Sequence, residues 1–104
     1  MNRELVNFFL DHLSIERRLS SHTITSYSSD LEQFIAFINP KNLQQVQAME
    51  VRKWLISLSD DNIQNRSINR KLATLRTFFK YLLRTGKIEE NPMTSIRMVK
   101  TTKK

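Results

Sequence analysis

The sequence is poor in the residues that form disulfides, metal sites and tight turns. It has no Cys, one Gly and two Pro among 104 residues. Without Cys, neither a disulfide framework nor a thiolate metal site is possible. So few Gly and Pro residues leave little from which to build tight β-hairpins or a Gly-rich phosphate loop. An all-α fold is therefore favoured from composition alone.

Long apolar runs are also absent. No stretch approaches the roughly 20 apolar residues that a membrane-spanning helix needs, and the N-terminal stretch MNRELVNFF contains an acidic residue and no signal-peptide core. We expect a cytoplasmic chain with no membrane partner. A chain of 104 residues has the size of one domain that folds without disulfides or metals.

Four amphipathic segments are expected to be helices, because apolar residues recur in them at helical spacing. They cover residues 3–16, about 22–38, roughly 47–59 and about 65–84. Ser20 and Ser21 are good N-cap residues before the second segment, and Asn39-Pro40 ends it. Gly86 follows the fourth segment where a left-handed cap is favoured. Four helices with short connections predict a compact all-α bundle.

The fourth segment has an apolar face and a basic face. At 100° per residue, one arc holds Ile68, Leu72, Leu75, Phe79, Leu82 and Leu83. The opposite arc holds Arg66, Arg70, Thr77, Lys80 and Arg84. No acidic residue lies between Arg66 and Lys87, whereas an ordinary exposed helix alternates Glu with Lys and Arg. The basic face is therefore expected to contact a polyanion.

The charge of the whole chain is unevenly distributed along the sequence. Residues 1–65 carry six Lys or Arg against eight Asp or Glu, a net charge of −2. Residues 66–104 carry eleven against two, a net charge of +9, and the two parts together give the +7 of the chain. Clustered Lys and Arg displace counterions from a phosphate backbone, so the C-terminal part points to nucleic acid.

No side chains converge as catalysis or metal binding requires. Asp60-Asp61 and Glu89-Glu90 are adjacent pairs in expected loops, where neighbouring side chains diverge. His12 and His22 are expected to lack acidic partners at metal-ligand spacing. We expect no catalytic residue, no metal and no cofactor in this chain.

Donor groups are expected at the start of the second segment and along the fourth. The first turns of the second segment expose His22, Thr25, Ser26 and Ser29, which can donate to phosphates or base edges. The N-terminus of a helix also favours phosphate. The candidate cations of the fourth segment are Arg66, Arg70, Lys71, Arg76, Lys80 and Arg84. Lys71 or Arg76 can alternatively pair with Asp30, Glu32 or Glu50.

Two stretches carry a family resemblance, LSSHTITSYSSDLEQFIAFI and SINRKLATLRTFFKYLLRTGKIEENPMTSI. Together they resemble the N-terminal core-binding domain of the tyrosine recombinase and phage integrase family, close to its Xer type. The likeness covers nearly all of residues 3–100. It implies a four-helix SAM-like bundle over residues 1–98, and the start of a linker over residues 99–104 to a C-terminal catalytic domain that is absent here.

The resemblance implies that this domain holds duplex DNA and does not cut it. In the family, the N-terminal and catalytic domains close around DNA as a clamp, and the catalytic domain cleaves and rejoins strands through a phosphotyrosine bond. Tyr27 and Tyr81 are therefore not expected to be nucleophiles. The implied partners are double-stranded DNA and, in the full-length recombinase, its own catalytic domain and further protomers.

The implied DNA contacts come from two segments and the linker. They are His22, Thr23, Thr25 and Ser26, then Arg66, Ser67, Arg70, Lys71, Thr74 and Arg76, with Lys100, Lys103 and Lys104 following the backbone through the linker. Lys80 joins them from the basic face.

Two other functions stay open at this point. The first is a small helical DNA-binding regulator, although residues 59–65 form a longer turn than a tight helix-turn-helix connection and contain no Gly. The second is a helical protein-interaction module whose basic face meets an acidic protein.

Overall fold

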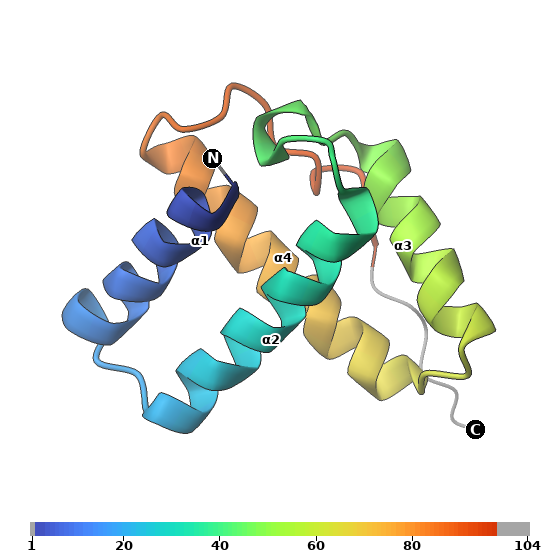
Figure 1. Cartoon of the computed structure of the whole chain (residues 1–104), viewed down its shortest axis with the longest axis horizontal. Helices are drawn as coiled ribbons and strands as arrows, with labels where there is room; N and C mark the ends of the chain where they lie inside the picture. Colours follow the sequence, from blue (N-terminus) through green and yellow to red (C-terminus); the bar gives the residue numbers. More distant parts are fainter. Residues whose placement is uncertain (1, 98–104) are drawn as a thin grey trace.

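Residues 2–97, the part of the chain that the computed structural model describes, form four α-helices joined by short connections (Figure 1). The helices are α1 (Asn2–Asp11), α2 (Ser21–Ile38), α3 (Ala48–Asp60) and α4 (Asn65–Arg84). A π-helical turn, η1 (His12–Glu16), follows α1, and a 3₁₀ turn, η2 (Leu43–Gln45), precedes α3. α2 and α4 cross near their middles, and α1 and α3 flank opposite halves of α4 (Figure 1). The predicted all-α bundle is confirmed.

Local capping signals explain why the start of α2 and the end of α4 agree closely with the predicted ones. Ser20 has an extended backbone, and its Oγ accepts a hydrogen bond from the Thr23 backbone N–H at 3.2 Å, so α2 begins there. Gly86 follows α4 with φ at +78°, a left-handed conformation that favours glycine. The Lys87 backbone N–H then reaches back to the Leu82 carbonyl at 2.8 Å, which closes the end of the helix.

The first predicted helix differs from the structure at its C-terminal end. Residues 3–16 were expected to be one helix, but the chain widens into the π-helical η1 after Asp11. The Arg17 backbone N–H bonds the His12 carbonyl at 3.2 Å, five residues back. The wider turn keeps Leu13 fully buried while His12 lies over Tyr81. A π turn encloses one residue more than an α turn. At the end of a helix, this difference is too small to alter the apolar periodicity of the sequence.

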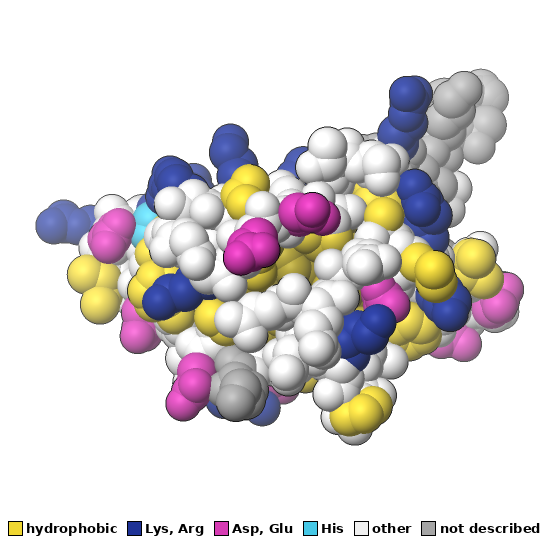
Figure 2. Space-filling view, turned by 90° about the horizontal axis from the view of Figure 1, so that it is seen from above, with side chains coloured by type: hydrophobic (Ala, Val, Ile, Leu, Met, Phe, Trp, Pro, Cys, Tyr) yellow, Lys and Arg dark blue, Asp and Glu magenta, His cyan; other side chains and the backbone are white. Residues whose placement is uncertain are grey.

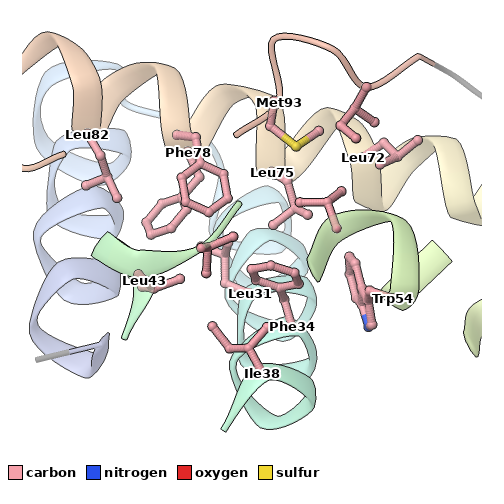
Figure 3. Packing of buried hydrophobic residues seen from close by; sticks show 14 of the residues in the cluster. Leu31, Phe34, Ile38, Leu43, Trp54, Leu72, Leu75, Phe78, Leu82 and Met93 are labelled. Atoms are coloured by element: carbon pink, nitrogen blue, oxygen red, sulfur yellow. The ribbon is translucent and has the colours of Figure 1, made fainter. Parts of the chain in front are cut away.

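The core lies where the four helices meet (Figure 3). Phe34 of α2 is fully buried and packs edge-on against Trp54 of α3, with ring centroids 5.1 Å apart, and against Phe79 of α4 at 6.2 Å. Leu75 and Leu82 of α4 are also fully buried in this cluster. Trp54 is 3% exposed and therefore anchors α3 in the core.

The buried face of α4 is rotated slightly about the helix axis relative to the predicted face. Phe78, which the predicted arc omitted, is fully buried against Phe9 of α1, with ring centroids 5.2 Å apart. Leu83, at the other end of the predicted arc, keeps 40% of its surface exposed, so its prediction as a core residue is wrong. α1 packs on the Phe78 side of α4, and a single-helix projection does not contain this neighbour.

None of the helices within residues 2–97 is long and apolar enough to cross a membrane.

Glu50 ties the start of α3 to the loop before it, and this contact should depend on pH. Its carboxylate accepts from Lys41 Nζ and from the Gln47 backbone N–H, each at 2.7 Å. The Lys41 side chain first, and the Gln47 N–H second, hold the pKa of Glu50 below its ordinary value. Such a group stabilises the fold above its unfolded-state pKa, and this contribution is lost as the pH falls through the folded-state pKa.

We expect Glu50→Gln to lower the free energy of unfolding by about 0.5–1 kcal/mol at pH 7, because the Lys41 ion pair and the stronger charged acceptor are lost. The difference from the wild type should shrink below a pH of about 4. Urea unfolding at pH 7 and at acidic pH measures it. Glu32→Gln, which removes an exposed carboxylate paired with Arg3, is the matched control and should change little. A Glu50→Gln deficit that is the same at both pH values would contradict the assignment.

Candidate nucleic-acid interface

The first turns of α2 present predicted contact residues at the surface. His22, Thr23, Thr25 and Ser26 are all exposed. The Ser20 hydroxyl, besides capping the helix, donates to Thr23 Oγ1 at 3.0 Å. The N-cap thus holds the Thr23 hydroxyl as well as the start of the helix.

The outer face of α4 carries the predicted cations. Arg66, Arg70, Lys80 and Arg84 are exposed, whereas Ser67 and Arg76 are half-buried. Arg76 donates to the Ile96 carbonyl at 3.0 Å, so it is tied to the loop after α4 and not to an acidic residue. Figure 2 shows Lys and Arg side chains spread over this side of the molecule, several of them along its upper edge, with Asp and Glu side chains among them.

Two predicted contact residues of α4 lie inside the protein. Lys71 and Thr74 are 6% and 5% exposed, and both bond the buried carboxylate of Asp30. Lys71 therefore forms the ion pair with Asp30 that the sequence left as an alternative. Direct DNA contact by Lys71 and Thr74, as expected from the resemblance, does not fit this burial, because their polar groups are engaged across the helix crossing.

A hollow between α2 and α4 brings the two groups of predicted residues together. Thr23, Ser26 and Tyr27 line it from α2, and Arg70 and Ala73 line it from α4, with Asp30 and Thr74 completing the lining. Residues more than 40 positions apart in the chain thus share one surface. Hydroxyls and a guanidinium at such a surface can donate to phosphates and to base edges.

A second, basic hollow extends from the outer face of α4 toward η1. It is lined by Phe9, His12, Arg17, Arg76, Thr77, Lys80, Tyr81 and Arg84. Sequence reasoning missed Arg17, because nothing in the chain indicates that residues after η1 approach the second half of α4. Lys80 and Arg84 were expected on this face from their helical spacing.

His12 has an acidic partner, which corrects the expectation from the sequence. Its Nδ1 lies 2.9 Å from Glu16 Oε1, and its ring stacks on Tyr81 with centroids 4.1 Å apart. One His and one carboxylate do not make a metal site. In the part of the chain that the structure describes, no group of three or more His, Asp or Glu residues is placed to hold a metal ion.

The predicted contact residues Lys100, Lys103 and Lys104, and the linker expected over residues 99–104, lie outside the described residues.

The sequence of this helical bundle matches a known family of domains. The model of the family described as phage integrase, N-terminal SAM-like domain, matches residues 6–86. The chain belongs to this family, so the resemblance seen in the sequence is confirmed.

Curated relatives cover almost all of this chain. It is 35% identical over 101 residues to the tyrosine recombinase XerC of Oceanobacillus iheyensis, a match that spans 94% of this chain and 33% of the relative. It is 38% identical over 101 residues to the tyrosine recombinase XerC of Alcanivorax borkumensis, spanning 97% of this chain and 33% of the relative. The chain thus spans about a third of the length of these relatives.

The fold also matches a solved structure. The crystal structure of a lambda integrase (75-356) dimer bound to a COC′ core site superposes with a TM-score of 0.82 at 18% identity. The match covers 96% of this chain and 36% of that one. The helical arrangement is therefore shared at low sequence identity.

Proposed function

We propose that this chain binds duplex DNA as the N-terminal clamp domain of a site-specific tyrosine recombinase, and that it does not cleave strands by itself. The relatives named above are tyrosine recombinases about three times as long. The solved neighbour is an integrase dimer on a DNA core site. In the full-length protein, a catalytic domain and further protomers would complete the complex on DNA.

One observation carries the proposal: Arg70 of α4 lines the same surface hollow as Thr23 and Ser26 of α2. Cations supply salt-dependent affinity for phosphates, and hydroxyls supply short-range donors and acceptors to phosphates or base edges. The major groove of B-DNA admits an α-helix. The surface where α2 and α4 cross therefore has the chemistry for duplex DNA.

The proposed contacts are the predicted residues of α2 and α4 that are exposed or half-buried. They are His22, Thr23, Thr25, Ser26, Arg66, Ser67, Arg70, Arg76 and Lys80. In this proposal Lys71 and Thr74 support the surface from below.

The two tyrosines fit a binding domain better than a cleaving one. Tyr27 is half-buried and packs edge-on against Phe9, with ring centroids 5.8 Å apart. Tyr81 is half-buried beneath the stacked ring of His12. We assign both to packing, and assign strand cleavage to the separate catalytic domain.

A salt titration tests the proposal. The affinity for a short duplex, followed by fluorescence anisotropy, should fall steeply with salt concentration. Arg70→Ala should weaken binding about tenfold and lower the slope of log affinity against log salt by about one, because one phosphate contact is lost.

Arg52→Ala is the matched control for this titration. Arg52 is exposed on α3 and bonds Ser95 Oγ at 3.2 Å, away from the α2 and α4 surface. It removes the same charge and should leave the slope unchanged. Salt-independent binding, or the same slope change for both variants, would contradict the proposed interface. Binding to an acidic protein but not to DNA would favour an interaction module instead.

A further inference from the structure

Asp30 is a buried carboxylate directly beneath the proposed DNA-binding surface. It is 1% exposed and lies where α2 crosses α4. Its Oδ1 accepts from Arg70 at 2.8 Å and from Lys71 Nζ at 3.0 Å, and its Oδ2 accepts from Thr74 Oγ1 at 3.0 Å. One side chain of α2 therefore holds three side chains of α4.

The contacts around Asp30 are well matched in charge and hydrogen bonding. Burying a carboxylate costs free energy unless it is paired and hydrogen-bonded. Two cations and one hydroxyl meet this need, and Lys71 Nζ also donates to Gln33 Oε1 at 2.8 Å, one turn further along α2. Within the described residues, no buried side-chain nitrogen or oxygen lacks a hydrogen-bond partner. The network thus sets the register of α2 against α4.

Arg70 connects this buried network to the surface. Its side chain is 56% exposed although its partner Asp30 is buried. An unanchored Arg side chain loses rotamer entropy when it is fixed in a complex. Because Asp30 already anchors one N–H group, part of this ordering is complete before DNA binds. Arg70 also lines the hollow that Thr23 and Ser26 line from α2.

We propose that Asp30 is a positioning residue for DNA binding, which acts by holding the Arg70 guanidinium in the hollow between α2 and α4. This inference rests on the proposed function. Asp30, a buried acidic residue, thus strengthens the binding of polyanionic DNA.

The sign of the effect separates positioning from simple charge. A carboxylate near DNA repels phosphates, so neutralising it should tighten binding if only the net charge mattered. If Asp30 instead positions Arg70, its neutralisation should weaken binding. Glu32→Gln is the matched control, since Glu32 is an exposed acid two residues further along α2 and pairs with Arg3 of α1, not with α4.

A double-mutant cycle on duplex DNA binding tests the inference. We expect Asp30→Asn to weaken binding about fivefold to tenfold and to lower the salt slope by up to about one. Glu32→Gln should bind as tightly as the wild type or slightly tighter. When Arg70→Ala is already present, Asp30→Asn should cause no further loss. A general structural defect caused by Asp30→Asn would weaken binding in the wild type and in Arg70→Ala alike. The absence of a further loss in Arg70→Ala is therefore specific to positioning.

Wild-type or tighter binding by Asp30→Asn, or full additivity with Arg70→Ala, overturns the inference. Circular dichroism and thermal unfolding show whether the variant is folded. If Asp30→Asn does not fold, Arg70→Lys decides, because it keeps the exposed charge and removes the guanidinium fork. Loss equal to that of Arg70→Ala supports positioning, and wild-type affinity of Arg70→Lys overturns it.

The two proposals fail in different ways. Absence of salt-dependent duplex binding by the wild type overturns the proposed function together with this inference. If the wild type binds and Arg70→Ala weakens it, but Asp30→Asn does not, only the role of Asp30 is rejected.

Discussion

Replacing Arg66, Arg70 and Lys80 together by Ala is expected to weaken duplex DNA binding at least about 100-fold at low ionic strength. The three side chains are exposed along the outer face of α4, which carries no acidic residue of its own, although Arg70 also pairs with Asp30 of α2. Each lost phosphate contact also removes about one released counterion, so the salt slope should fall by about three. Fluorescence anisotropy over a salt series measures both quantities.

A variant with the same charge change elsewhere controls for net charge. Arg3, Arg52 and Lys53 are exposed on α1 and α3, outside the proposed interface. Their joint replacement by Ala should lower affinity only slightly through long-range electrostatics, and this loss should vanish near physiological salt. Unchanged binding in the α4 variant, or equal losses in the two variants, would reject α4 as the DNA-contacting helix.

The second large effect concerns the core. Phe34→Ala is expected to lower the free energy of unfolding by about 3–5 kcal/mol, because it leaves a cavity between α2, α3 and α4. Phe34 is fully buried against Trp54 and Phe79, so all three helices lose contacts (Figure 3). In a domain of this size the melting temperature should fall by roughly 15 °C or more. Thermal and urea unfolding measure the change.

Phe37→Ala is the matched control for the core. It removes the same atoms from the same helix three residues away, where the ring is 40% exposed. Its cost should stay below about 1 kcal/mol, since little cavity forms and the ring already contacts water. Equal destabilisation by the two variants would show that the core is not centred where α2, α3 and α4 meet.

The helix ends of this protein are examples of what local sequence predicts well. α4 was expected over about residues 65–84 and is observed from Asn65 to Arg84. Its end depends on Gly86, whose left-handed backbone is favoured by glycine whatever lies around it. The start of α2 likewise depends on Ser20 and its neighbours. Such signals act within one turn, so the sequence carries them in full.

The chemistry of the candidate site was predictable from the sequence, but only some of its residues were. Exposed Arg66, Arg70 and Lys80 follow from their common arc on one helix. The burial of Lys71 depends on Asp30, one of three acidic residues that the sequence offered as partners. A helical projection gives the direction of a side chain and not the neighbour that covers it, so this choice was not determined by spacing.

The amino-acid sequence alone determined the all-α class, the start of α2, the end of α4, the family and the basic face of α4, because these depend on composition and on spacing within a few turns. Tertiary structure decided which cations stay free, where Arg17 lies and how Asp30 joins α2 to α4. The physical reason is that these features depend on the angle at which helices cross. That angle results from the packing of Phe9, Phe34, Phe78 and Phe79 across the whole core, and no single segment contains it.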